Sequence, residues 1–297
     1  MAVVQIKTPN AGLSKSRLPS WLRHSKTDFR ALHELKVKFR ERRLHTVCES
    51  ARCPNIHECF SRKAATFMIM GNICSRTCGF CAVPQGTPEA LDHDEPHNVA
   101  AMAAEMNLRY VVITSVNRDE LIDGGARHFS QTIRCVRAAL PNARIEVLTP
   151  DFCGNTDALE ILIDAEPDVF NHNMETIERL YRRVRPQANY HQSLDILRFV
   201  RDRKPNILTK SGLMVGLGES RDEVHSLLDD LRNTGTSVAT IGQYLQPRRN
   251  RLPVEEFIAP EIFESYRQYG ESIGFRTVFS GPLVRSSYMA EKIEHTT

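Results

Sequence analysis

Three cysteines at CxxxCxxC spacing, Cys74, Cys78 and Cys81, constrain this chain more than any other feature of its sequence. This barrel triad, as we call it, follows an apolar run over residues 65–70 that ends at Gly71, a pattern that predicts a buried strand leading into a loop. Thiolates grouped this tightly are typical of iron–sulfur ligation, because cysteine sulfur holds the irons of these clusters. A cubane cluster contains four irons and this loop offers three thiolates, so one iron would be left open to bind another molecule.

Two other uses of clustered cysteines fit less well. Structural zinc is usually held by four ligands in paired motifs, and this loop has neither a second cysteine pair nor a neighbouring histidine. Disulfide frameworks are typical of small secreted domains, whereas this chain has 297 residues and shows no secretory signal. An iron–sulfur cluster is therefore the preferred interpretation, with structural zinc as its main alternative.

A second group of three cysteines, with the spacing CxxxxCxxxxxC, precedes the first. This N-terminal triad consists of Cys48, Cys53 and Cys59. Pro54 and Asn55 inside it predict an irregular loop, which can wrap several thiolates around one centre. The two triads contain six of the eight cysteines of the chain. Cysteines used as ligands rather than as disulfides indicate a reducing compartment, so we expect a cytoplasmic protein with two metal centres.

Beyond the triads, β-like runs alternate with helical stretches. The predicted strands cover residues 110–114, 144–149, 168–171, 207–211, 238–241 and 277–279. The predicted helices cover residues 98–107, 129–140, 156–165, 192–203, 220–234 and 260–273. Repeated βα units predict a parallel sheet covered by crossover helices, either in a (β/α) barrel or in a doubly wound sheet. Because the barrel triad and later polar segments follow strands, we expect the chemistry at the carboxyl ends of the strands.

Composition sets further limits on the class of protein. A hydrophobic content of 41% and a charged content of 25% are ordinary for a globular protein. The sequence contains no run of eighteen apolar residues, so it predicts no membrane-spanning helix. The net charge of +3 is too small to indicate nucleic-acid binding by itself. Charge is nevertheless uneven, because residues 1–27 are basic and contain no acid, which fits either a transit peptide or a mobile basic arm. A helix predicted over residues 28–44 continues this basic character.

With Phe80 as its aromatic position, the first cysteine loop reads CxxxCxΦC and resembles the signature of the radical S-adenosylmethionine (radical SAM) superfamily. The resemblance implies that Cys74, Cys78 and Cys81 hold a [4Fe–4S] cluster whose open iron binds SAM. Reductive cleavage of SAM would then give a 5′-deoxyadenosyl radical. The resemblance also implies an α/β fold, a partial (β/α)6 TIM-type barrel with N-terminal and C-terminal extensions.

The two triads, followed by the RSSY motif at residues 285–288, closely resemble the lipoyl synthase family. The resemblance runs from about residue 40 to residue 290 and includes the segments 114–119, 148–152, 171–176 and 211–219. It implies an N-terminal extension that carries the N-terminal triad (1–61), a radical SAM barrel (62–280) and a tail with the RSSY motif (281–297). The alternatives are another sulfur-inserting enzyme of the biotin synthase type and an iron–sulfur electron carrier.

The resemblance also implies roles for individual residues. The N-terminal triad would hold an auxiliary [4Fe–4S] cluster that serves as the sulfur source. Ser287, in preference to Ser286, would be its fourth ligand, and Arg285 would control access to that iron. From their places in the cysteine motif and at strand ends, the residues that we expect to contact SAM are Phe80, Thr114, Ser115, Asn171 and Glu175.

The implied reaction inserts two sulfur atoms, at C6 and C8, into an octanoyl chain carried on a lysine of another protein. The partners would be an octanoylated carrier, either H protein or an E2 lipoyl domain, and a reducing protein such as ferredoxin or flavodoxin. No nucleic acid or membrane is expected, and the enzyme would act as a monomer. Since lipoyl carrier domains are commonly acidic, the predicted basic helix would help to dock them, through Lys36, Lys38, Arg40 and Arg42.

Overall fold

The computed structural model describes residues 19–22, 29–50, 53, 55–56, 66–287 and 290–295. Cys59 of the N-terminal triad and Tyr288 of the RSSY motif lie outside the described residues. Within the described part, none of the helices is long and apolar enough to cross a membrane.

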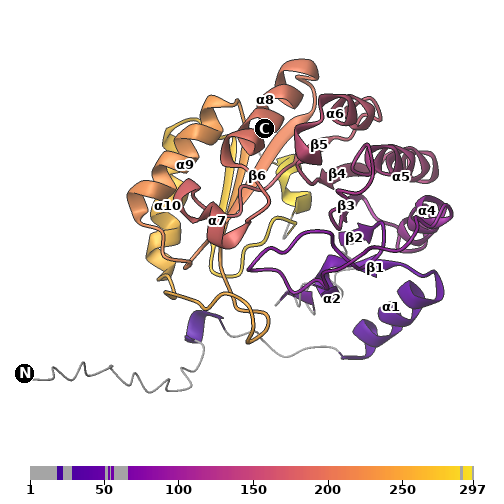
Figure 1. Cartoon of the computed structure of the whole chain (residues 1–297), viewed down its shortest axis with the longest axis horizontal. Helices are drawn as coiled ribbons and strands as arrows, with labels where there is room; N and C mark the ends of the chain where they lie inside the picture. Colours follow the sequence, from indigo (N-terminus) through magenta and orange to yellow (C-terminus); the bar gives the residue numbers. More distant parts are fainter. Residues whose placement is uncertain are drawn as a thin grey trace, which may run out of the picture.

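One eight-stranded sheet forms the centre of the molecule, with its strands in chain order (Figure 1). The strands are β1 (His45–Thr46), β2 (Thr66–Ile69), β3 (Tyr110–Ser115), β4 (Arg144–Leu148), β5 (Val169–Asn171), β6 (Leu208–Val215), β7 (Val238–Gln243) and β8 (Thr277–Gly281). β1 is antiparallel to β2, and all later neighbours are parallel. Among the described residues no pairing joins β8 back to β1, so the sheet curves without closing. The predicted partial barrel is confirmed.

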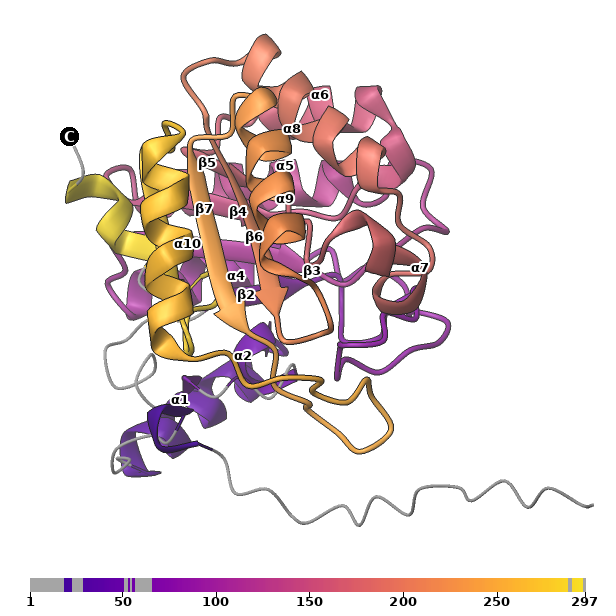
Figure 2. The same cartoon turned by 90° about the vertical axis from the view of Figure 1, so that its left-hand side faces the viewer.

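Helices cover the outer face of this sheet (Figures 1 and 2). They are α4 (Glu95–Glu105), α5 (Ala126–Ala139), α6 (Thr156–Ile163), α7 (Tyr181–Val184), α8 (Tyr190–Arg203), α9 (Arg221–Asn233) and α10 (Pro260–Ser272). Apart from the short α7, each lies within three residues of a predicted helix. In α9, for example, Ser220 and Glu223 form the capping box that starts the helix, and Val224 and Leu228 lie on its buried face.

The N-terminal part packs beside β2. Helix α1 (Phe29–Glu41) brings the ring of Phe39 to 5.5 Å from the ring of Phe67 in β2. This helix ends earlier than predicted, because Arg43 adopts a left-handed φ of 54° and turns the chain into β1, a strand that the sequence pattern did not predict. The one-turn helix α2 (Val47–Ser50) follows and carries Cys48.

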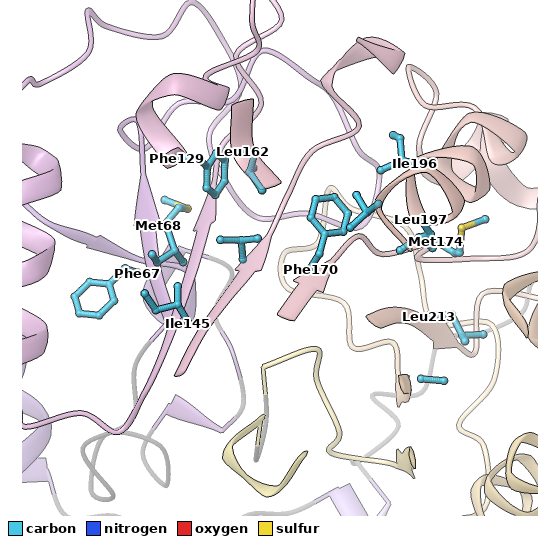
Figure 3. Close-up of a cluster of buried hydrophobic side chains, with 14 of the residues drawn as sticks. Phe67, Met68, Phe129, Ile145, Leu162, Phe170, Met174, Ile196, Leu197 and Leu213 are labelled. Carbon is cyan, nitrogen blue, oxygen red and sulfur yellow. The ribbon is translucent and has the colours of Figure 1, made fainter. Parts of the chain in front are cut away.

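The outward face of the strands and the inward faces of the helices form one hydrophobic core (Figure 3). Phe67, Ile145 and Phe170 come from the strands, while Phe129 and Leu162 come from helices α5 and α6, and all five are completely buried. Helices therefore cover the outward face of the parallel strands, as expected for a sheet of this class.

The opposite face of the strands points into the barrel, and its side chains include a buried charged cluster. The Lys210 ammonium lies 2.9 Å from the Glu146 carboxylate, and neither side chain is more than 1% exposed. Asn171 and Tyr110 also donate hydrogen bonds to Glu146, at 3.0 and 2.7 Å. Polar pairing, and not hydrophobic packing, thus fills this part of the barrel interior.

β6 is longer than predicted. We predicted a strand over residues 207–211, with the glycine-containing segment 212–219 following it. In the structure Gly212 lies within β6 and pairs with Thr240 of β7, and the strand continues to Val215. The glycine is tolerated because other side chains occupy the space beside it, as described below.

Candidate active site

The barrel triad lies in the loop after β2, at the carboxyl end of the sheet. Cys74, Cys78 and Cys81 line one cavity of about 210 Å³, which we call the first cavity. The Cys74 N–H donates to the Pro84 carbonyl at 2.8 Å, which fixes one end of the loop. Burial raises the pKa of the Cys78 thiol to about 11 and that of Cys81 to about 12. These thiols therefore keep their protons at neutral pH until a metal displaces them.

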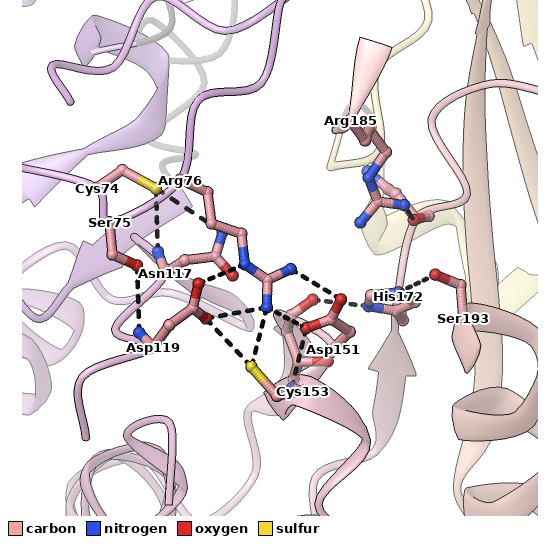
Figure 4. A network of polar contacts seen from close by, with 12 residues as sticks. Cys74, Ser75, Arg76, Asn117, Asp119, Asp151, Cys153, His172, Arg185 and Ser193 are labelled. Atoms are coloured by element: carbon pink, nitrogen blue, oxygen red, sulfur yellow. Dashed lines mark hydrogen bonds and ion pairs between the residues drawn. The ribbon is translucent and has the colours of Figure 1, made fainter. Parts of the chain in front are cut away.

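Arg76, between the first two cysteines, ties this loop to its neighbours (Figure 4). Its guanidinium bonds to Asp151 at 2.5 and 2.8 Å and to Asp119 at 2.6 and 2.9 Å. Burial alone would lower the pKa of Arg76, but the two carboxylates outweigh it and raise that pKa. Burial likewise would raise the pKa of Asp151, yet Arg76 lowers it. The ion pairs hold the cysteine loop against the loops that follow β3 and β4.

Four of the five residues predicted to contact SAM line the first cavity: Phe80, Thr114, Ser115 and Glu175. Thr114 donates to the Leu148 carbonyl at 2.9 Å. Burial raises the pKa of Glu175, although the nearby Arg185 and the amide of Asn173 oppose this. The fifth residue, Asn171, does not line the first cavity, because it bonds to Glu146 in the barrel interior.

Three buried polar atoms of the first cavity have no hydrogen-bond partner among the described residues. They are Ser115 Oγ, Asn117 Oδ1 and Asn173 Oδ1. Buried polar groups are normally hydrogen-bonded, so unpartnered atoms that line a cavity indicate a polar ligand. SAM carries amino, carboxylate and hydroxyl groups that fit these atoms.

Arg185 is a buried cation of the first cavity that the sequence analysis missed. Its Nη1 donates to the carbonyls of Asn173 at 2.8 Å and Met174 at 3.1 Å. Burial disfavours its charge, but Tyr181 and Glu175 outweigh this and raise its pKa. No sequence signal separated Arg185 from the arginines just before it in the chain.

His172 and Asn117 also line the first cavity without having been assigned a role. The two ring nitrogens of His172 bond to the Thr149 carbonyl at 3.0 Å and the Ser193 hydroxyl at 3.1 Å. Burial lowers the pKa of His172 to about 4, so the ring is neutral at pH 7. The Asn117 N–H donates to the sulfur of Cys74 at 3.3 Å. Both residues fall in segments that resemble the lipoyl synthases, which was the available signal.

The described members of the N-terminal triad line a second cavity, of about 350 Å³. Cys48 comes from α2 and Cys53 from the loop after it. Arg285, Ser286 and Ser287 of the RSSY motif line the same cavity, so the fold brings the tail to these cysteines. Burial raises the pKa of Cys53 and lowers that of Arg285, and the nearness of these two groups opposes both shifts.

The two cavities share one wall. Val47, Phe80, Cys81 and Leu148 line both of them. A molecule in the second cavity therefore lies next to the barrel triad.

The donor chemistry of the first cavity is that of an iron–sulfur cluster. Cys74, Cys78 and Cys81 bring three sulfur ligands to this cavity, and an iron–sulfur cluster binds each thiolate at a different iron. The residues present thus fit an iron–sulfur cluster in the first cavity, with SAM beside it.

Comparisons with known proteins agree with this geometry. A model of the radical SAM superfamily matches residues 68–231, and a model of the N-terminal domain of lipoyl synthase matches residues 4–53. The lipoyl synthase of Rubrobacter xylanophilus is 53% identical over 92% of this chain and 85% of its own. That of Caldicellulosiruptor bescii is 52% identical over 94% and 96%. In fold, the FeFe-hydrogenase maturase HydG of Carboxydothermus hydrogenoformans matches with a TM-score of 0.55, at 14% identity over 77% of this chain and 64% of its own.

These matches decide the class of enzyme. They rule out the electron carrier and the biotin synthase type, since the long and close matches are to lipoyl synthases. Such an enzyme is a radical SAM sulfurtransferase that uses SAM and [4Fe–4S] clusters, and it requires an octanoylated substrate protein and a reductant. The chain belongs to the lipoyl synthase family of the radical SAM superfamily, and its activity is the sulfur insertion that makes the lipoyl group.

Proposed function

We propose that the barrel triad holds the cluster that binds SAM and that Cys48, Cys53 and Cys59 hold the auxiliary cluster, with Ser287 as its fourth ligand. In this arrangement residues 1–61 carry the auxiliary cluster, residues 62–280 carry the SAM site and residues 281–297 supply the serine. The observation that carries the proposal is the wall shared by the two cavities, because sulfur insertion needs both centres close to one substrate chain.

When bound, SAM supplies the radical that removes hydrogen from the octanoyl chain, and the auxiliary cluster supplies sulfur. The residues of this chain orient the reactants and exclude water. Thr114, Ser115 and Glu175 offer polar atoms to SAM, while Leu148 and Met214 offer apolar surface to the eight-carbon chain. Arg285 lines the same cavity as Cys53, which supports its predicted role in controlling access to the auxiliary cluster.

Replacing Cys48, Cys53 and Cys59 together by alanine is expected to abolish sulfur insertion while SAM is still cleaved. Iron should fall from about eight to about four atoms per chain, because one cubane cluster is lost. The measurement is anaerobic turnover of an octanoyl-lysine peptide with dithionite and SAM, followed by mass spectrometry for two added sulfurs and for 5′-deoxyadenosine.

Cys135→Ala is the matched control, since this half-buried cysteine of α5 lies far along the chain from both triads. It should retain full iron content and sulfur insertion. A triple variant that still inserts sulfur would refute the assignment of the N-terminal triad, and zinc in place of iron would refute the clusters themselves.

The basic helix α1 is less available to a carrier protein than its sequence indicates. Lys38 and Arg42 each bond to Glu105 of α4 at 2.7 Å. Lys36 lies 3.2 Å from Glu49. Three of the four cations that were predicted to dock the carrier thus form ion pairs within the chain. The sequence of α1 does not indicate these pairs, because the glutamates come from other helices.

Arg40, together with Arg43 and His45, remains available next to the auxiliary site. These residues line a surface hollow at the end of α1, directly before α2 with Cys48. Neither arginine forms an ion pair with another described residue. We propose that this hollow contacts the acidic surface of the octanoylated carrier, whether H protein or an E2 lipoyl domain.

Replacing Arg40 and Arg43 by glutamate is expected to raise the KM for an octanoylated carrier about ten-fold at low salt, because charge complementarity governs docking. Turnover of a short octanoyl-lysine peptide should change little, and the difference between variants should shrink as salt rises. Steady-state kinetics with both substrates gives the comparison. R198E/R201E on the exposed side of α8 is the control, and an unchanged carrier KM in R40E/R43E would exclude this surface.

The remaining partners follow from the same proposal. The reductant is a small electron carrier of the ferredoxin or flavodoxin type, and the enzyme acts as a monomer in the cytoplasm. Five of the seven described cysteines are assigned to clusters in this proposal, and cysteines used as ligands are typical of a reducing compartment.

A further inference from the structure

We propose that Asn173 is a positioning residue that holds the Ser286–Ser287 pair of the tail at the second cavity and links it to the first. The inference rests on the proposed function for what the two cavities contain. It assigns to Asn173 a task in the placement of the tail, separate from any contact with SAM.

The side-chain amide of Asn173 donates to two acceptors at once. Nδ2 lies 2.7 Å from Ser286 Oγ and 2.9 Å from Glu175 Oε1. Arg185 bonds to the Asn173 carbonyl at 2.8 Å, so the backbone is also held. Asn173 and Glu175 line the first cavity, whereas Ser286 lines the second. This hydrogen bond therefore connects the SAM side of the barrel to the tail.

Gly212 of β6 provides the space for this contact. A Cβ at this position would lie 2.9 Å from Asn173 Oδ1, 3.3 Å from Ser286 Oγ and 2.5 Å from Thr240 Oγ1. A side chain here would force the Thr240 hydroxyl and the Asn173 amide to move and would crowd the Ser286 hydroxyl. A glycine inside a buried strand otherwise weakens the sheet, so a close approach of other groups accounts for it.

Two further contacts hold the tail just before Ser286, at Leu283 and Val284. A Cβ on Gly242 of β7 would collide with the Val284 carbonyl, so the bare glycine lets the tail backbone lie against the strand. Asn55, in the loop of the N-terminal triad, donates to the Leu283 carbonyl at 2.7 Å. The tail thus lies across β7 and β6, and Asn173 fixes its position beside the serines.

Removing the side-chain amide of Asn173 should make the segment around Ser286 and Ser287 more mobile. In Asn173→Ala, amide hydrogen exchange over residues 281–287 should be about five-fold faster or more, as expected for a segment that has lost one hydrogen bond. Ser286→Ala removes the acceptor from a half-buried tail position and should give a similar increase. The double variant N173A/S286A should exchange no faster than either single variant, because both act through one bond.

The experiment uses cluster-loaded protein, with exchange read by mass spectrometry. Electron paramagnetic resonance after mild oxidation should show several-fold more [3Fe–4S] signal in N173A, because the serine that closes the auxiliary cluster is held less firmly. Asn117→Ala is the control, because Asn117 also lines the first cavity but bonds to Cys74 and not to the tail. This variant should leave the exchange of residues 281–287 unchanged.

Exchange of the tail within two-fold of the original protein in both single variants would overturn the inference, as would additive effects in the double variant. Iron content and SAM cleavage are measured in the same samples. An original protein without two clusters would instead refute the proposed function, so the two failures are distinguishable.

Discussion

Arg76→Met is expected to destabilise the fold by about 3–5 kcal/mol, the usual cost of removing one partner from a buried ion pair. Asp151, at 1% exposure, would keep a buried charge without its cation, and Asp119 would lose its bidentate partner. The cysteine loop would no longer be held against the loops after β3 and β4. We therefore also expect poor incorporation of the cluster at the barrel triad.

The prediction has a pH signature as well. In the folded state Asp151 has a lowered pKa, so the stability that it contributes is present above the ordinary pKa of 3.8 and is lost as pH falls through the lower folded value. Without Arg76, burial is left to raise that pKa, so Asp151 no longer contributes stability that is lost as pH falls. The destabilisation by R76M should therefore be largest near neutral pH and should shrink at acidic pH, where Asp151 takes up a proton.

Urea unfolding, followed by circular dichroism at several pH values, measures both effects. Arg76→Lys should recover part of the stability, since it restores the charge without the bidentate geometry. The matched control is Arg127→Met, whose side chain is 81% exposed and lies 3.9 Å from Asp123, and a surface pair of this kind contributes only about 0–1 kcal/mol. If R76M and R127M lost equally little stability, the structural importance of Arg76 would be disproved.

Lys210→Met should have an effect of similar size for the same physical reason. It would leave the completely buried carboxyl group of Glu146 with hydrogen bonds from Asn171 and Tyr110 but without its cation, at an expected cost of about 3–5 kcal/mol. The double variant K210M/E146Q should regain most of the loss, because the amide carries no buried charge. Its oxygen can accept the hydrogen bond from Asn171, and its NH2 group can donate to the Tyr110 hydroxyl.

Chemical denaturation of the single and double variants gives the comparison. Lys204→Met serves as the control, since Lys204 pairs at 3.0 Å with Asp164 on the surface. A K210M variant as stable as K204M, or a double variant no better than the single one, would contradict the expected cost of the unpaired carboxylate.

Much of the fold could be predicted because its signals are local. The helices α4 to α6 and α8 to α10 follow from apolar spacing, caps and breakers within each segment. β1 was missed because two residues carry no periodicity. The end of β6 was misplaced because Gly212 reads as a breaker, and its use depends on Asn173 and Ser286, which come from elsewhere in the chain.

The site was predictable in part for the same reason. Phe80, Thr114, Ser115 and Glu175 line the first cavity, as their places in the cysteine loop or near strand ends indicated. Asn171 comes from such a strand end too, yet its side chain bonds within the barrel interior, since Glu146 lies beside it on the neighbouring strand. Local position places a residue near the site without deciding its hydrogen bonds.

By itself the sequence predicted cysteine-ligated clusters and a parallel βα sheet, because the cysteine spacing and the βα alternation are properties of short segments. The resemblance to a known family, carried by such short segments too, then implied the partial barrel and the sulfur insertion. The tertiary structure alone decided which distant residues meet. Lys38 pairs with Glu105 across 67 positions and Asn173 bonds to Ser286 across 113. Such contacts depend on strand register and on the path of the tail through the barrel, and the residue types at either end do not encode that geometry.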